Sequence, residues 1–149
     1  MKGKKVLISL DSSSLGDTIS WIPYLEKFQE KHNCKVFCRA PFSDLFEKVY
    51  PNITFINEEP EGLYATYNIG WFDDWQNQDK NPDDPRLIPL QKTASDILGL
   101  DHEEEKTRIH IKDKDRPIKE KYVCISTAST SACRHWQNPT GWQETVDYL

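Results

Sequence analysis

Apolar runs and amphipathic stretches alternate along the first part of the chain. Lys5–Leu10 predicts a buried strand, and Asp17 to about Lys31 has a helical period, with its apolar stripe at Ile19, Ile22, Leu25 and Phe28. Further elements are predicted as a strand at Lys35–Arg39, a short helix from Pro41 to about Val49, and strands within 51–56 and 63–69. Alternating strands and helices imply parallel pairing with right-handed crossovers. The pattern therefore predicts an α/β fold, the front half of a doubly wound sheet.

A long aperiodic segment follows these elements. The stretch Gly70–Leu87 (GWFDDWQNQDKNPDDPRL) is rich in Asp, Asn, Pro and aromatic residues, so we expect an ordered loop, of the kind that often serves binding. The next apolar period, LQKTASDILGL, predicts a helix that Gly99 closes. A strongly charged stretch then contains one predicted short strand, Arg108–Ile111, and Pro117. This change of composition predicts a domain boundary.

After the charged stretch the opening pattern begins again. YVCIS (122–126) predicts a buried strand, 127–140 a loop with many small hydroxyl residues, and GWQETVDYL the opening of a helix. We therefore predict a Rossmann-like domain over 1–113, a linker at 114–120, and the beginning of a second Rossmann-like domain over 121–149. A chain of 149 residues has room for one such core and a fragment of another.

Composition narrows the classes of function. The net charge of -5 comes without a basic stripe, which disfavours a nucleic-acid binder. The apolar part of MKGKKVLISL is shorter than the roughly 7–15 residues of a signal peptide, and no segment has the length to span a bilayer. We therefore expect a cytoplasmic protein. The four cysteines (Cys34, Cys38, Cys124 and Cys133) are expected to be reduced thiols, and their spacing is a weak metal signal.

The first strand ends in LDSSSLGDT, a loop of small residues that leads into a helix. Such a loop exposes backbone N–H groups to a ligand at the carboxyl edge of a sheet. It lacks both GxGxxG and the P-loop lysine, which disfavours a nucleotide-dependent oxidoreductase. Asp17 has two interpretations, an N-cap of the helix or a general base beside a bound ligand.

The loop of the second unit suits a diphosphate. Hydroxyls of Thr127, Ser129 and Thr130 would bind phosphate oxygens, and the Arg134 guanidinium would neutralise the charge of a leaving group. The alternative for Arg134 is a solvated surface side chain. Trp136 and Trp142 are expected to be packing residues.

Three blocks carry a resemblance to a known family: LDSSSLGDTISWIPYLEKF, YNIGWFDDW with PLQKTASDILGL, and STASTSACRHWQNPTGWQETVDYL. In this order, over almost the whole chain, they resemble the bacterial autotransporter heptosyltransferases of glycosyltransferase family nine. The resemblance implies a GT-B enzyme, in which two Rossmann-like domains face each other across a cleft. The acceptor would lie mostly on the first domain and the nucleotide sugar mostly on the second.

The resemblance also implies roles for residues. Asp17 matches the aspartate of the family's GD motif, the proposed catalytic base, and Arg134 stands where the family usually has a phosphate-contacting lysine. Substrate contacts are expected from the remaining residues of the two loops: Ser13, Ser14, Gly16, Thr18, Thr127, Ser129 and Thr130. The implied reaction moves heptose from an ADP-activated donor to a protein serine or a glycan hydroxyl and inverts the configuration at the anomeric carbon. No cofactor or metal is expected beyond this donor, and a homo-oligomer is possible.

The sequence departs from the family in its extent. The family's small N-terminal domain and most of its C-terminal domain, with a cysteine-rich iron site, have no counterpart here, and the four cysteines do not match that site. We therefore expect a fragment that, alone, binds donor poorly and turns over slowly if at all. The rival interpretation is a flavodoxin-like or receiver-like module that binds a small ligand at Asp11 and Asp17 without catalysis.

Overall fold

The computed structural model describes residues 1–70, 81–111, 118–129 and 135–149. Contacts divide the chain into two units, Met1–Lys112 and Asp113–Leu149, and each is described by itself. The predicted aromatic loop lies largely outside the described residues, as does much of the predicted linker at 114–120. Within the described part, no helix is long and apolar enough to cross a membrane.

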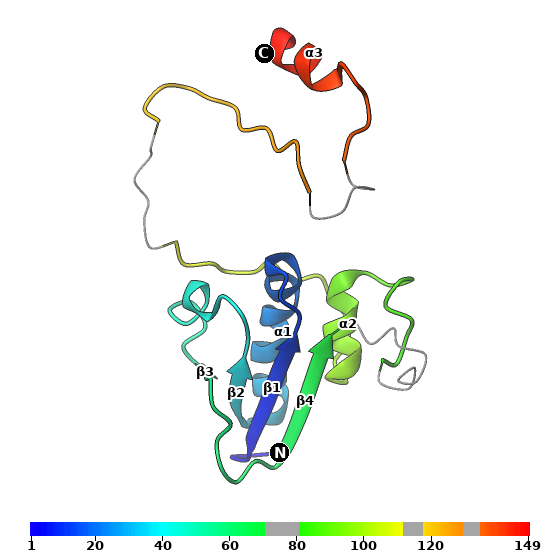
Figure 1. Ribbon diagram of the computed structural model, residues 1–149. Helices are drawn as coiled ribbons and strands as arrows, with labels where there is room; N and C mark the ends of the chain where they lie inside the picture. Colours follow the sequence, from blue (N-terminus) through cyan, green and yellow to red (C-terminus); the bar gives the residue numbers. More distant parts are fainter. Residues whose placement is uncertain (71–80, 112–117, 130–134) are drawn as a thin grey trace. The chain divides into compact units, whose positions relative to one another are not determined.

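The first unit is built on a parallel sheet of four strands: β1 (Lys5–Asp11), β2 (Lys35–Arg39), β3 (Ile53–Phe55) and β4 (Ala65–Gly70). Their order is β3-β2-β1-β4, and every neighbouring pair is parallel (Figure 1). This order corresponds to strands 3-2-1-4 of the doubly wound dinucleotide-binding fold. The predicted α/β class and parallel pairing are confirmed.

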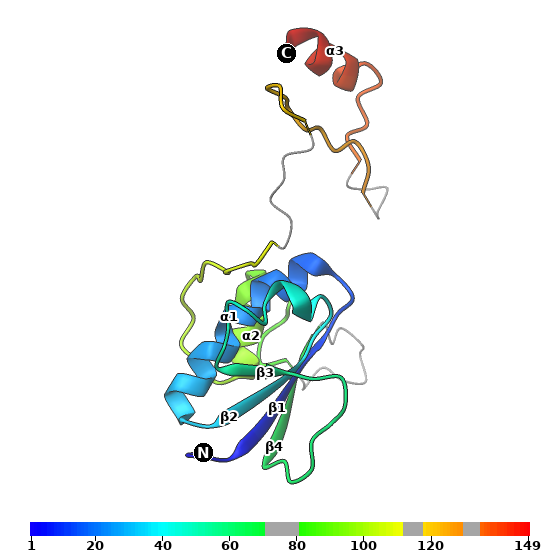
Figure 2. The same cartoon turned by 90° about the vertical axis from the view of Figure 1, so that its left-hand side faces the viewer.

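Two helices, α1 (Leu15–His32) and α2 (Leu90–Ile97), cover the same face of this sheet (Figure 2). The apolar stripe of α1 packs on the alternate residues of β1 and β2 that point to this face, and the buried core includes Val6, Ile8, Trp21, Leu25, Phe28 and Val36. The helix ends at His32 and is followed by the C-cap Asn33, which takes the left-handed conformation with φ 46°. Gly99, with φ 62°, follows α2 as predicted for a C-terminal glycine.

Two predicted elements of this unit differ from the structure. In place of a helix from Pro41 to Val49 there is only the 3-10 turn η1 (Ser43–Leu45), because Phe42 takes a left-handed conformation that interrupts a helix. The predicted strand Arg108–Ile111 is wrong: the segment has no regular secondary structure and joins no sheet. Its Arg108 amide donates to the Tyr50 hydroxyl and its His110 amide to the Leu45 carbonyl.

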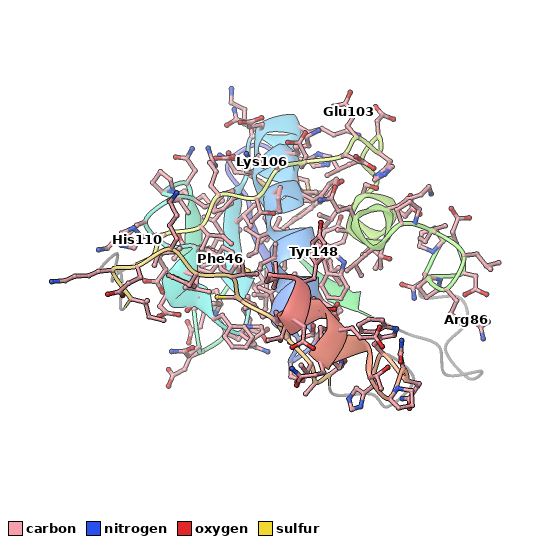
Figure 3. The ribbon with its side chains drawn as sticks, turned by 90° about the horizontal axis from the view of Figure 1, so that it is seen from above. Phe46, Arg86, Glu103, Lys106, His110 and Tyr148 are labelled. Carbon is pink, nitrogen blue, oxygen red and sulfur yellow. The ribbon has the colours of Figure 1, made fainter. Side chains whose placement is uncertain are left out.

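Residues 101–111, which we call the strap, cross α1 from the α2 side to η1 (Figure 3). Lys27 of α1 holds the strap through Glu103 and Glu105, at 3.0 and 2.6 Å. The Thr107 hydroxyl donates to the Ile19 carbonyl at 2.5 Å. Arg108 pairs with Glu26 at 2.6 Å and lies over the Tyr50 ring. The charged side chains of the strap therefore form ion pairs that hold it against α1.

The second unit contains α3 (Gly141–Tyr148), at the position of the predicted helix. The predicted buried strand 122–126 is wrong, because the described residues of this unit offer it no strand to pair with and leave Val123 65% exposed. Trp136 and Trp142 pack edge to face with ring centroids 5.1 Å apart, but Trp136 is 50% exposed, so their assignment as packing residues stays a prediction. A Cβ on Gly141 would lie 2.5 Å from Trp136, so this contact requires glycine.

Candidate functional site

The predicted site of the first unit lies at the carboxyl end of β1, beside that of β4. Asp11, the last residue of β1, pairs with Gly70, the last of β4. The strand order reverses here, because β2 and β3 lie on one side of β1 and β4 on the other. In open α/β sheets ligands bind outside the carboxyl ends of the strands at such a switch point. The loop Ser12–Ser14, which joins β1 to α1, therefore has the position of a ligand site.

Asp17 is the third residue of α1, in its first turn. The N-cap is Ser14, so the interpretation of Asp17 as the N-cap is wrong. The Ser12 hydroxyl donates to Asp17 Oδ2 at 2.6 Å, and the Ser14 amide donates to Ser12 Oγ at 3.1 Å. The positive end of the helix dipole stabilises negative charge at this place. A half-buried carboxylate is thus held where β1 passes into α1.

The other predicted residues of this loop have different surroundings. Ser13, Ser14 and Gly16 are exposed. A Cβ on Gly16 would meet Ser14 Oγ only at 3.7 Å, so the fold itself does not require glycine there. Thr18 is fully buried, and its hydroxyl donates to the Ser14 carbonyl at 3.0 Å. This contact supports the first turn of α1, and a ligand contact by Thr18 stays a prediction.

The predicted phosphate-binding residues belong to the second unit. Thr127 is exposed and Ser129 half-buried, whereas Thr130 and Arg134 lie outside the described residues. His135 Nε2 lies 3.1 Å from the Ser129 amide nitrogen and 2.9 Å from its carbonyl oxygen. The tautomer decides whether the imidazole donates or accepts. His135 thus contacts the backbone of one of the predicted phosphate-binding residues, Ser129.

Sequence reasoning missed two residues of these loops, Ser12 and His135. Ser12 is the first of three serines that follow the strand, but nothing in the sequence shows which of the three reaches Asp17. His135 follows Arg134 directly, and nothing in the sequence shows that its imidazole contacts Ser129. Both contacts depend on how the loops turn.

The cysteines do not form a metal centre in the described residues, where no group of three or more His, Cys, Asp or Glu could hold an ion. Cys34 and Cys38 are free thiols in the core, and burial raises the pKa of both. A raised pKa disfavours the thiolate that binds metals. Cys124 is a free exposed thiol, and Cys133 lies outside the described residues.

No family model matches the chain. It is 42% identical over 154 residues to the autotransporter heptosyltransferase Aah of Escherichia coli, covering 100% of this chain and 39% of Aah. It is 38% identical over 152 residues to BimC of Burkholderia thailandensis, described as an inactive autotransporter heptosyltransferase, covering 99% of this chain and 36% of BimC. The chain thus spans well under half the length of these relatives.

Among solved structures, the chain is similar to TibC from enterotoxigenic E. coli, described as a bacterial iron-containing dodecameric glycosyltransferase. The TM-score is 0.86 at 36% identity, over 100% of this chain and 40% of TibC. A second TibC structure, in complex with ADP-D-beta-D-heptose, gives a TM-score of 0.85 at 37% identity. Fold and sequence together relate the chain to the glycosyltransferases. Within that class it is homologous over its whole length to the autotransporter heptosyltransferases, and the resemblance noted in the sequence is confirmed.

These comparisons correct one prediction. We expected no cofactor, but both TibC structures are described as iron-containing. The expectation came from the mechanism that the resemblance implies, which needs no metal at the reaction centre, and that mechanism does not decide whether a relative also holds iron. The described residues do not fit such a site, since they offer no cluster of ligands. No step of the chemistry below is therefore assigned to iron.

Proposed function

We propose that this protein is part of a heptosyltransferase that moves heptose from ADP-heptose to a hydroxyl group. The observation that carries the proposal is the match of the whole chain, at 37% identity and a TM-score of 0.85, to a structure solved with ADP-D-beta-D-heptose. The flavodoxin-like or receiver-like alternative has no comparable support.

Asp17 is the residue proposed to act on the acceptor. Its carboxylate would take the proton of the acceptor hydroxyl as that oxygen attacks the anomeric carbon of heptose. The bond from that carbon to the diphosphate breaks, ADP leaves with the electron pair, and the configuration is inverted. What supports this role is a carboxylate held by Ser12 at the carboxyl edge of β1, with exposed Ser13, Ser14 and Gly16 beside it. These three residues would shape the acceptor pocket.

The loop of the second unit is proposed to bind the leaving diphosphate. Thr127, Ser129 and Thr130 would donate hydroxyl hydrogen bonds, and Arg134 would offset the charge that develops on ADP. A guanidinium keeps the positive charge of the family's lysine but binds phosphate in a planar, two-pronged geometry. This difference makes Arg134 a candidate determinant of donor preference.

Acceptor and assembly are proposed from the relatives. Because Aah and TibC are described as autotransporter heptosyltransferases, a serine of an autotransporter polypeptide is the favoured acceptor over a glycan. TibC is described as dodecameric, and we propose that this protein also forms a homo-oligomer. Exposed apolar side chains of the second unit, among them Val123, Val146 and Leu149, would be covered in such an assembly.

A homologue without transferase activity is a second candidate, because BimC is described as inactive at 38% identity. The protein encoded by the complete gene should therefore be incubated with ADP-heptose and a serine-containing autotransporter polypeptide. ADP release and the mass of the polypeptide are then measured, with UDP-glucose as the control donor. We expect heptose addition from ADP-heptose alone. Absence of transfer, in a folded protein that still binds ADP-heptose, would instead support the inactive homologue.

A further inference from the structure

The Ser12 hydroxyl occupies the centre of a short chain of hydrogen bonds at the start of α1. It accepts a hydrogen bond from the Ser14 amide at 3.1 Å and donates one to Asp17 Oδ2 at 2.6 Å. Ser12 itself lies outside the helix, on the connection from β1. The bond therefore ties the end of the strand to the first turn of the helix.

The direction of the Ser12 proton follows from these partners. A serine hydroxyl has one proton to donate and lone pairs to accept with. The Ser14 amide points its own hydrogen at the oxygen, and the carboxylate can only accept while it is ionised. The serine proton is thus directed to Asp17, and a charge-assisted O–H···O⁻ bond of this length is among the strong ones.

Neighbouring hydroxyl groups make different hydrogen bonds from that of Ser12. Thr18 donates to the carbonyl of the N-cap Ser14, and Ser20 donates to the Gly16 carbonyl within α1. Ser14 is the N-cap but makes no capping bond through its side chain. Ser12 thus differs from Thr18 and Ser20 in donating its proton to a carboxylate and not to a backbone carbonyl.

We propose that Ser12 is a positioning residue that holds the Asp17 carboxylate in the orientation needed for proton transfer. The inference rests on the proposed role of Asp17 as the base. A general base must lie within hydrogen-bond reach of the proton it takes, and a small misplacement lowers the rate steeply. By fixing Oδ2, Ser12 fixes the plane of the carboxylate and so the direction of its other lone pairs. Its contribution is therefore to the chemical step and not to donor binding.

The test compares four variants of the protein encoded by the complete gene, in steady-state transfer from ADP-heptose: Ser12→Ala, Ser12→Thr, Ser20→Ala and Asp17→Ala. Ser12→Ala is expected to lower kcat roughly ten- to hundredfold, with KM for ADP-heptose unchanged. Ser12→Thr keeps the hydroxyl and should retain most of kcat. Ser20→Ala, the matched control, removes a serine hydroxyl from the helix that carries Asp17, where it bonds to the Gly16 carbonyl and not to the carboxylate, and should behave as wild type.

Each other outcome decides the question. Wild-type kcat in Ser12→Ala together with a slow Asp17→Ala overturns the positioning role and leaves the proposed function standing. Wild-type kcat in Asp17→Ala overturns the proposed base itself. If Ser12→Thr is as slow as Ser12→Ala, the loss is one of local structure and the proposal is wrong. Should Ser12→Ala fail to fold, Ser12→Cys replaces it: the thiol is a weak donor of similar size, and unchanged kcat in that variant also overturns the proposal.

Discussion

Tyr24 links α1 to the strap, and its replacement by phenylalanine should weaken the first unit measurably. The side chain is fully buried. Its hydroxyl lies 2.6 Å from the Glu103 carbonyl oxygen, to which it donates, and 3.1 Å from Gln91 Oε1. The Tyr24→Phe variant keeps the ring and its packing and removes only this oxygen. The change therefore isolates the polar contact between helix and strap.

The size of the effect follows from the partners that remain. Gln91 keeps its bonds to the backbone of Glu105, at 2.9 Å to the amide and 2.8 Å to the carbonyl. The Glu103 carbonyl, in a partly buried place, loses the donor that the Tyr24 hydroxyl supplied. Leaving such an acceptor unsatisfied costs about 1–3 kcal/mol, so we expect the free energy of unfolding to fall by this amount.

Urea denaturation followed by far-UV circular dichroism at neutral pH measures this quantity. Tyr64→Phe is the matched control, because Tyr64 is 60% exposed in the same unit and its ring contact with Lys4 survives the change. The control should lie within about 0.5 kcal/mol of wild type. If Tyr24→Phe is no less stable than Tyr64→Phe, the hydroxyl does not fasten the strap and the reasoning is refuted.

The Tyr24→Phe substitution should also change how the free energy of unfolding depends on pH in the alkaline range. Burial raises the pKa of Tyr24 from 10.0 to about 12. A folded-state pKa above the unfolded value gives stability that is fully present below pH 10.0 and is lost as pH rises towards about 12. Wild type should therefore lose stability over this range more steeply than Tyr24→Phe. Parallel pH profiles of the two proteins would contradict the burial of this hydroxyl.

Two further predictions concern the strap and the second unit. Lys27→Met should destabilise the first unit modestly at neutral pH, and the difference from wild type should shrink in acid. The reason is that Lys27 lowers the pKa of Glu103 below its ordinary 4.5. The stability that this ion pair adds is therefore present above pH 4.5 and is lost as pH falls further. Urea titrations in acid that show an undiminished difference between the two proteins would contradict this prediction. Gly141→Ala should displace the Trp136 ring, because the new Cβ would lie 2.5 Å from it. Near-UV circular dichroism should show the loss of the Trp136–Trp142 contact, and an unchanged spectrum would argue against that packing.

The elements that were predicted correctly are those in which apolar residues recur with the period of a strand or a helix and pack into the core. The apolar run of β1 and the stripe of α1 face each other in one core, so pattern and burial agree. The segments Arg108–Ile111 and 122–126 have equally strand-like composition. They are not strands in the structure, because strand formation needs a neighbour to pair with and the sequence does not show whether one is present.

The residues of the candidate site also differ in whether the sequence alone could identify them. Asp17 could be singled out because a carboxylate follows a strand and a small-residue loop. Ser12 could not, because its bond to Asp17 depends on the turn that brings residues five positions apart into contact. Residue type suggests the chemistry of a loop, but only its backbone path decides which side chains meet.

The central claim is that the Asp17 carboxylate acts as the base in heptose transfer. The most direct measurement is the single-turnover rate of ADP release from ADP-heptose in the presence of acceptor, for wild type, Asp17→Ala and Asp44→Ala, in the protein encoded by the complete gene. Asp44 is the matched control, since it also lies in the first turn of a helical segment, η1. We predict a loss of about a hundredfold or more for Asp17→Ala, as expected when a general base is removed, and a wild-type rate for Asp44→Ala. Equal rates in all three proteins would contradict the account.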